Sequence, residues 1–200
     1  MVVPKIYILT LNWNGRKHLE YFLKHASNIS YSNYTTVVID NGSTDDSIHY
    51  VKENYPDVKI ISNNINLGYS RGFNIGIKFA LESNADYILI TNNDVIIHKD
   101  LLKEGVNLYT KEDNIGFMSG KVYELNSKKK FQYAGGRFNS NSSFMPSRGA
   151  GQIDEGQYET VEDFDFMDDV CCLISSEMIE HIGPYDEDFF FDYEETEWNF

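Results

Sequence analysis

The sequence contains little cysteine and no long apolar run, and each scarcity excludes a class of protein. Its 200 residues include two cysteines, and these are the neighbours Cys171 and Cys172. Adjacent cysteines rarely bridge each other and lack the spacing of metal ligands, so we expect two buried apolar side chains in a reducing cytoplasm. No apolar run is long enough to span a membrane. The N-terminus has no cationic leader and is predicted to be a first strand rather than a signal peptide.

Basic residues are absent from the last part of the chain. No lysine or arginine follows Arg148, whereas that stretch contains 17 of the 31 acidic residues. Residues 1–148 therefore carry 17 basic and 14 acidic side chains, a net charge of +3, and the remainder carries −17, which together give the formal charge of −14. Such an acidic stretch repels nucleic acid, so we expect no polynucleotide partner. A small anion bound by the first part remains compatible with its charge.

The first half of the chain alternates short apolar runs with helical patterns. Strands are predicted at 5–11, 35–39, 58–61 and 87–90. Apolar residues at helical spacing predict helices around 19–26 and 73–81, and Ser43 or Thr44 can cap a further helix. This alternation predicts an α/β fold with a mostly parallel central sheet flanked by helices. With 42% hydrophobic residues and no internal repeat, we expect one domain.

The second half follows a different pattern, with four predicted features. They are a strand and hairpin over 115–138 with its turn at Gly135-Gly136, a mobile loop at 139–160, a strand at Phe164–Ser175, and a helix at Ser176–Ile182 that stops at Gly183-Pro184. The loop is predicted from its Ser, Gly and Asn content and its weak periodicity. We expect it to close over a bound acceptor.

Polar residues follow the predicted strands, at the place where open parallel sheets bind their ligands. After the second strand, residues 40–43 (DNGS) place Asp40 beside a glycine turn, where it can accept a hydrogen bond from a base or a ribose hydroxyl. The same residues also fit an ordinary capped start of a helix. Residues 66–76 contain three glycines that let the backbone approach a ligand, and Arg71 offers a planar fork for phosphate. A plain loop-to-helix junction is the alternative there.

The end of the fourth strand and the last stretch of the chain contain the carboxylates best placed for chemistry. Asp94 ends residues 91–94 (TNND), where a carboxylate can ligate a Mg²⁺ or Mn²⁺ that holds a diphosphate, although a simple strand-end turn also explains it. The acidic segment, residues 186–197, contains seven carboxylates interrupted by Phe189–Phe191 and Tyr193. We expect these aromatics to bury neighbouring acids and raise their pKa values, as a general base requires. A solvated acidic face is the alternative.

Taken in order, five blocks of sequence resemble the inverting glycosyltransferases of family 2, and most closely the rhamnosyltransferase-like branch that builds bacterial surface polysaccharides. The blocks are Thr10–Gly15 (TLNWNG), Val37–Asp45 (VVIDNGSTD), Asn66–Tyr69 (NLGY) with Asn74–Gly76 (NIG), Leu89–Asp94 (LITNND), and Ile182–Phe190 (IGPYDEDFF) with Tyr193–Glu197 (YEETE). The resemblance covers nearly the whole chain except 126–160 and is specific to the family, though not to the substrate. It implies a GT-A fold, in which a Rossmann-like sheet binds a nucleotide diphospho-sugar.

The resemblance implies a role for residues in each block. Thr10, Asn12, Asp40 and Ser43 should hold the nucleoside, with Asp40 on the base, and Gly68, Arg71, Asn74, Asn92 and Asn93 should line the pocket of the nucleotide sugar. Asp94 should be the sole protein carboxylate on the divalent cation, because Asn92 replaces the first acid of the family's Asp-x-Asp motif. Glu195 should be the catalytic base, at a position where the family usually has aspartate. Glu194 is the alternative candidate for that base.

The implied reaction moves a sugar from a UDP- or dTDP-linked donor to a hydroxyl of a saccharide or lipid-linked acceptor. The cation neutralises the departing diphosphate, and Glu195 takes the proton of the acceptor as it attacks the anomeric carbon, so configuration inverts. We expect one GT-A domain over 1–200, in which 1–125 bind the nucleotide sugar and 126–200 carry the acceptor site and the base. Family members usually continue further, so we expect a missing C-terminal part, through which any contact with the inner face of the plasma membrane is made.

Two other functions fit parts of the sequence. A sugar-phosphate nucleotidyltransferase would need a glycine-rich, arginine-containing loop directly after the first strand, whereas residues 10–15 contain Gly15 alone, followed by Arg16. A non-catalytic nucleotide-sugar sensor would be consistent with Asn92 and Glu195. Transfer or hydrolysis of radiolabelled nucleotide sugars separates an enzyme from a sensor.

Overall fold

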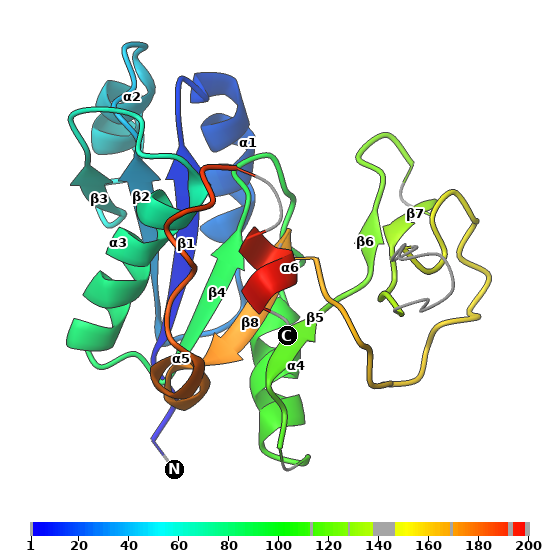
Figure 1. Cartoon of the computed structure of the whole chain (residues 1–200). Coiled ribbons are helices and arrows are strands. Elements are labelled where there is room, and N and C mark those ends of the chain that lie inside the picture. The colour runs from blue at the N-terminus through cyan, green and yellow to red at the C-terminus, as the bar shows by residue number, and fades with distance from the viewer. Residues whose placement is uncertain are drawn as a thin grey trace.

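A six-stranded sheet with the strand order β3-β2-β1-β4-β8-β5 forms the centre of the protein in the computed structural model (Figure 1). The structure describes residues 2–112, 114–127, 129–137, 147–168, 170–191 and 194–198. The strands of this sheet are β1 (Ile6–Asn12), β2 (Tyr34–Asp40), β3 (Lys59–Ser62), β4 (Tyr87–Thr91), β5 (Phe117–Ser119) and β8 (Cys171–Ser175). The first four run parallel, which confirms the predicted α/β fold with a mostly parallel sheet.

Strand β1 illustrates why the apolar runs form the middle of the sheet. Ile6 and Ile8 pack into one hydrophobic core, and Tyr7 and Leu9 pack into the other. A parallel strand covered on both faces reads as a continuous apolar run, because each side chain is buried on one face or the other. The four strands predicted in the first half are all present, each within one residue of its predicted bounds.

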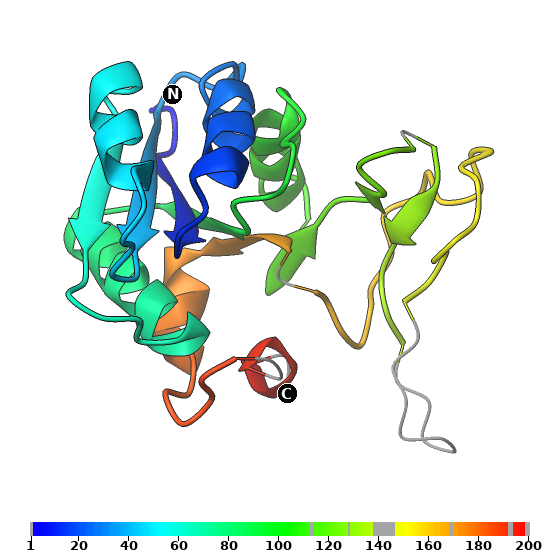
Figure 2. The same cartoon turned by 90° about the horizontal axis from the view of Figure 1, so that it is seen from above.

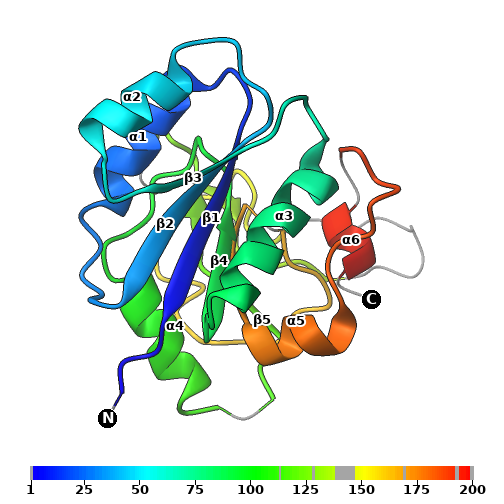
Figure 3. The ribbon, with the colours of Figure 1, turned by 90° about the vertical axis from the view of Figure 1, so that its left-hand side faces the viewer.

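Helices cover both faces of the sheet (Figures 2 and 3). One face carries α1 (Arg16–Ala26), α2 (Ser47–Asn54) and α4 (Leu101–Tyr109), and the other carries α3 (Tyr69–Glu82) and α5 (Ser176–Ile182). The apolar stripes predicted for α1 and α3 are buried against the two cores. Helix α5 has its predicted bounds and ends at Gly183, where a φ of 90° favours glycine. Helix α4 has no predicted counterpart.

Strand β8 runs antiparallel to both of its neighbours, β4 and β5. It begins at Cys171, so the strand predicted at Phe164–Ser175 is too long. Cys171 and Cys172 are free and buried, as predicted. Burial raises the pKa of the Cys171 thiol to about 12, which keeps this thiol protonated and unreactive at neutral pH.

A smaller two-stranded sheet, β6 (Val122–Tyr123) and β7 (Phe131–Tyr133), lies beside the main sheet (Figures 1 and 2). Its hairpin connection falls within 124–130, so the turn predicted at Gly135-Gly136 is wrong. Gly136 instead forms isolated bridges to segments further along the chain. The Lys121 amino group donates to Asp154 at 3.2 Å and to Glu159 at 2.7 Å, which ties the start of the hairpin to the connection that follows it.

The loop predicted at 139–160 falls partly outside the described residues, which omit 138–146. Its described part lies against β7. The amide of Phe131 donates to the carbonyl of Gln152, and the amide of Ala134 donates to the carbonyl of Arg148, both at 2.9 Å. The mobility of this loop and its closure over an acceptor stay predictions.

Helix α6 (Glu194–Trp198) packs on the face that carries α3 and α5. The Trp198 indole lies with its ring centroid 4.3 Å from that of Tyr185 and donates through Nε1 to the carbonyl of Gly183 at 2.9 Å. The end of the acidic segment is therefore anchored in the core beside α3. Over the part of the chain that the structure describes, no helix has the length and hydrophobicity needed to cross a bilayer.

Candidate functional site

The carboxyl ends of β1, β2 and β4 meet at one edge of the sheet, which we call the carboxyl edge, and Asn12 joins them there. The side-chain amide of Asn12 donates to Asp40 Oδ1 and to Ser43 Oγ, both at 3.0 Å. Its oxygen accepts from Asn93 Nδ2 at 3.1 Å. Asn12 and Asp40 are both buried. Four residues predicted to hold the nucleotide sugar, which lie at or just after the ends of three separate strands, are thus close together.

The loops that follow β1 and β2 are bound to each other at the carboxyl edge. Asn14, in the left-handed region with a φ of 52°, accepts through Oδ1 from the amides of Thr44 at 2.7 Å and Asp45 at 3.3 Å. Its own amide donates to Ser43 Oγ at 2.8 Å. Ser43 and Thr44 therefore serve the loop, and the prediction that one of them caps α2 is wrong, because α2 begins at Ser47.

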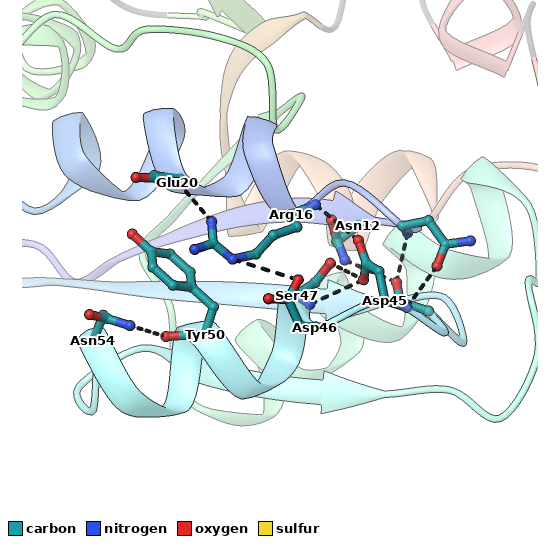
Figure 4. A network of polar contacts seen from close by, with 10 residues as sticks. Asn12, Arg16, Glu20, Asp45, Asp46, Ser47, Tyr50 and Asn54 are labelled. Carbon is teal, nitrogen blue, oxygen red and sulfur yellow. Dashed lines mark hydrogen bonds and ion pairs between the residues drawn. The ribbon is translucent and has the colours of Figure 1, made fainter.

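Arg16 extends this network to the start of α2 (Figure 4). Its guanidinium carbon lies 3.2 Å from the centroid of the Tyr50 ring, and Nη1 donates to Glu20 at 2.8 Å. The Arg16 amide donates to Asp45 Oδ2 at 3.2 Å, and Asp45 also accepts from the amide and the hydroxyl of Ser47. Polar contacts thus join the loops at the carboxyl edge to the start of α2.

The Asp45 carboxylate makes this network sensitive to pH. Burial alone would raise its pKa, but the Ser47 hydroxyl, the Ser47 amide and the Arg16 amide hold the pKa below its usual value. A carboxyl group whose pKa falls on folding stabilises the folded state above its unfolded pKa, and this stabilisation is lost as the pH falls through the folded pKa. We expect Asp45→Asn to be less stable than wild type at neutral pH, with the difference shrinking in acid.

Urea unfolding across a pH series measures this difference. Asp57→Asn, at an exposed carboxylate of the turn before β3, is the matched control for the chemical change and should leave the stability at neutral pH close to that of wild type. A stability difference between wild type and Asp45→Asn that stays constant from neutral pH to acid would contradict the prediction.

A cluster of asparagines supports the turn that leads into α3. The buried Asn41 donates through Nδ2 to the carbonyl of Gly68 at 2.8 Å, and its Oδ1 accepts from Asn63 Nδ2 at 2.9 Å. Asn66 Oδ1 accepts from the Gly68 amide at 2.9 Å. The sequence motifs include Asn41 and Asn66 without giving them a role. Asn63 carries no sequence signal, because an asparagine after a strand is common in loops.

Gly68, Arg71 and Asn74 contact the acidic segment and its approach. A Cβ on Gly68, which has a φ of 84°, would lie 2.5 Å from the carbonyl oxygen of Phe190. The Arg71 Nε lies 3.6 Å from Glu187 Oε2, and Asn74 donates to the carbonyl of Tyr185 at 2.9 Å. These three residues were predicted to line the pocket of the nucleotide sugar, and that role stays a prediction. In the structure Gly68 and Asn74 contact residues 185–190 directly, and Arg71 lies near the Glu187 carboxylate.

The structure also places Thr10 and Asn92, whose roles toward the nucleotide sugar stay predictions. Thr10 is fully buried in β1 beside Val38. Asn92 follows β4, and its Oδ1 accepts from the Tyr69 hydroxyl at 3.4 Å. Tyr69 is the first residue of α3, so this contact joins the carboxyl edge to that helix.

Asp94 is an exposed carboxylate that follows β4 at the carboxyl edge. It makes no hydrogen bond or ion pair with any residue that the structure describes, so its oxygens are open to an added ligand. The described residues contain no group of three or more acidic, histidine or cysteine side chains placed to hold a metal. One open carboxylate fits a Mg²⁺ or Mn²⁺ whose other ligands are water and phosphate oxygens, because these hard cations are held by few protein groups when they bind with a diphosphate.

The carboxylates at the end of the acidic segment differ in how exposed they are to solvent. Glu194 is 3% exposed, Glu195 is half-buried and Glu197 is exposed. Phe190 and Phe191 are 61% and 68% exposed, so these two rings lie outside the hydrophobic core, and the expectation that the aromatics bury neighbouring acids stays a prediction for them. The burial of Glu194 comes from the packing of α6, which places Glu194 and Trp198 on its inner side one turn apart.

An α/β sheet whose polar strand ends converge at one edge is the arrangement found in proteins that bind nucleotides. The sequence pattern described as glycosyl transferase family 2 matches residues 7–183. The chain belongs to this family, and its fold is the GT-A fold.

Two curated relatives span almost all of this chain. The low-salt glycan biosynthesis hexosyltransferase Agl10 of Haloferax volcanii is 26% identical over 202 residues, which cover 98% of this chain and 61% of that protein. The dTDP-rhamnosyl transferase RfbF of Shigella flexneri is 25% identical over 197 residues, which cover 96% of this chain and 61% of that protein. The chain thus spans about three fifths of the length of these relatives.

Solved structures share the fold at lower sequence identity. Residues 1–349 of S. aureus TarS superpose with a TM-score of 0.71 and 15% identity, covering 98% of this chain and 54% of that one. The mannosyltransferase PcManGT from Pyrobaculum calidifontis, in complex with GDP-Man and Mn²⁺, superposes with a TM-score of 0.64 and 16% identity, covering 94% of this chain and 49% of that one. At these identities the likeness concerns the fold alone.

Proposed function

We propose that this protein binds a nucleotide diphospho-sugar at the carboxyl edge and transfers the sugar, with inversion, to a hydroxyl of an acceptor. The observation that carries the proposal is the junction at Asn12, which gathers Asp40, Ser43 and Asn93 at the carboxyl edge, with the exposed Asp94 next to Asn93 in the chain. Membership of glycosyl transferase family 2 supports the reaction class. The dTDP-rhamnosyl transferase relative supports a dTDP-linked donor. A UDP-linked donor and a role in surface-polysaccharide synthesis are part of the same proposal.

The nucleoside binds between the loops after β1 and β2. Asp40 has both oxygens occupied, one by Asn12 and one by the amide of Ser43 at 3.2 Å, so its carboxylate is held in one orientation. Trp13 is 58% exposed in the neighbouring loop. An exposed indole face offers a stacking surface to a base. Sequence motifs pointed to Asp40 but not to Trp13, although the tryptophan stands within the first matching block.

The diphosphate lies at the end of β4, where Asp94 would hold the divalent cation. When bound, this cation neutralises the negative charge that grows on the departing nucleotide diphosphate. The Mn²⁺ present with GDP-Man in the mannosyltransferase structure supports such a cation in proteins of this fold.

Glu195 acts as the general base, and the exposure of α6 favours it over Glu194. A base must reach the acceptor hydroxyl, and Glu195 is accessible whereas Glu194 is directed inward. The acceptor oxygen forms a bond to the anomeric carbon as the bond from that carbon to the diphosphate breaks. Glu195 receives the hydroxyl proton, and the nucleotide diphosphate leaves from the opposite face. The acceptor is a saccharide or a lipid-linked saccharide, and the reaction takes place in the cytoplasm.

Thermal unfolding in the presence of UDP-, dTDP- and GDP-hexoses, each with Mn²⁺, tests the binding step. A ligand at a hundred times its Kd stabilises the folded state by about 2.7 kcal/mol, which raises Tm by about 5 °C or more in a chain of this size. We expect the nucleotide sugars of one nucleobase to raise Tm more than those of the other two. The rise in Tm should be smaller when EDTA replaces Mn²⁺. Hexose 1-phosphates, which lack the nucleoside, are the matched control. No shift with any of the three nucleotide classes would overturn the proposal.

A further inference from the structure

Helix α3 holds the residue that precedes the acidic segment through two hydrogen bonds to the backbone of that one residue. Asn74 accepts through Oδ1 from the Tyr185 amide at 3.0 Å and donates through Nδ2 to the Tyr185 carbonyl at 2.9 Å. Its Nδ2 also lies 3.3 Å from Glu187 Oε1. Both hydrogen bonds to Tyr185 are buried and join residues 111 positions apart. A side-chain amide that pairs with the backbone N–H and C=O of one residue fixes the position and the orientation of that residue's backbone.

Tyr185 is connected to α6 through its side chain, which packs against an aromatic ring of that helix. Tyr185 is 2% exposed, and its ring packs at 4.3 Å against Trp198, which lies on the same helix as Glu195. A second tether holds the middle of the acidic segment, where the Tyr69 amide at the start of α3 donates to the carbonyl of Phe190 at 2.7 Å. The acidic segment, red in Figure 3, therefore runs beside α3 and is attached to it on both sides of Glu187.

From these contacts we infer that Asn74 is a positioning residue for the general base and does not bind the donor nucleotide. This inference rests on the proposed function, because it takes Glu195 as the base. The buried amide of Asn74 fixes the position of the Tyr185 backbone. The Tyr185 ring packs against Trp198, and this packing fixes the position and rotation of α6. A catalytic group displaced by about 1 Å can lose about a hundredfold in rate, so a device that holds α6 acts on turnover rather than on donor binding.

Turnover and nucleotide affinity together test this role. We expect Asn74→Ala to lower kcat by about 10- to 100-fold while the KM for the donor and the Kd for its nucleoside diphosphate stay within about twofold of wild type. Asn74→Asp is nearly isosteric and keeps the acceptor for the Tyr185 amide but loses the donor. Its kcat should lie between those of Asn74→Ala and wild type. Lys78→Ala, one turn further along α3 and exposed, is the control and should match wild type. A parallel loss of nucleotide affinity would overturn the inference, as would an unchanged kcat.

A spectroscopic arm reports on α6 without requiring activity. The chain contains two tryptophans, so Trp13→Phe leaves Trp198 as the single emitter. In that background Asn74→Ala should shift the Trp198 emission to longer wavelength and increase its quenching by acrylamide, whereas Lys78→Ala should change neither. Circular dichroism and a cooperative thermal transition establish that each variant is folded. If Asn74→Ala fails to fold, Asn74→Asp takes its place in both arms.

The two arms separate failure of this inference from failure of the proposed function. Absence of transfer by wild type with every nucleotide sugar would refute the transferase proposal, and the Trp198 measurement would still decide whether Asn74 holds α6. An emission and a quenching constant unchanged by Asn74→Ala, in a folded protein, would overturn the positioning role even if transfer is observed.

Discussion

Glu195→Gln is expected to lower the rate of sugar transfer by about 10²- to 10⁴-fold, the range over which general acid–base catalysis contributes. The substitution keeps the size and the hydrogen-bonding shape of the side chain and removes its ability to accept a proton. Because Glu195 is assigned to the acceptor and not to the donor, the Kd for the nucleoside diphosphate should not change. Radiolabelled UDP- and dTDP-hexoses measure transfer and hydrolysis, and isothermal titration measures nucleotide binding.

Helix α6 offers its own controls for this experiment. Glu197→Gln makes the same chemical change at an exposed position two residues further along the helix and should leave transfer unchanged. Glu194→Gln changes a buried carboxylate beside Trp198, so its effect should be seen in stability rather than in the chemical step. If Glu195→Gln retains the wild-type rate and Glu194→Gln abolishes it, the base is Glu194 and the exposure argument fails.

The positions of the strands and of the carboxyl edge could be predicted because both follow from local sequence. A parallel strand buried on two faces must be apolar at consecutive positions. Strands β1, β2 and β4 each contain such an apolar run. The polar residues directly after them must then lie at one edge of the sheet. Asp40, Ser43 and Asn93 come together for that reason, without any long-range information beyond the direction of the strands.

The second half could be predicted less well, because its short strands carry little pattern. β5, β6 and β7 contain three, two and three residues, which is too short for alternation to distinguish strand from loop. The partner of each is chosen by tertiary packing. The hairpin turn was accordingly placed at Gly135-Gly136, the strongest local turn signal, whereas Gly135 actually packs against the Phe164 ring.

The contacts that Gly68 and Asn74 make could not be predicted for a related reason. Local sequence identified a glycine-rich start of a helix, which is typical of ligand-binding loops. It contained no information about which distant segment would lie there. The contacts of Gly68 with Phe190 and of Asn74 with Tyr185 are set by the packing of the acidic segment across α3, more than a hundred residues later in the chain. The glycine and the asparagine serve this packing.

Asp94→Asn is expected to abolish the effect of Mn²⁺ on the protein. Asp94 is the open carboxylate at the end of β4, and the described residues offer no group of three acids that could replace it. In wild type, Mn²⁺ should increase the affinity for the nucleoside diphosphate. In Asp94→Asn, the Kd measured with Mn²⁺ should equal the Kd measured with EDTA, because a neutral amide is a far weaker ligand for a hard cation. Transfer should fall by about 10²-fold or more, as expected when charge on a leaving diphosphate is no longer neutralised.

Two further variants show whether charge at this one position is responsible. Asp57→Asn removes an exposed carboxylate from the turn before β3, at the opposite end of the sheet, and should keep the Mn²⁺ effect. Asn92→Asp restores a second acid two residues before Asp94 and should tighten Mn²⁺ binding, which electron paramagnetic resonance of free Mn²⁺ measures directly. The increase in Mn²⁺ affinity should be limited, because the Tyr69 hydroxyl already donates to the side-chain oxygen at position 92 and a cation would compete for that oxygen. Equal Mn²⁺ affinity in wild type, Asp94→Asn and Asn92→Asp would place the cation elsewhere and remove Asp94 from the mechanism.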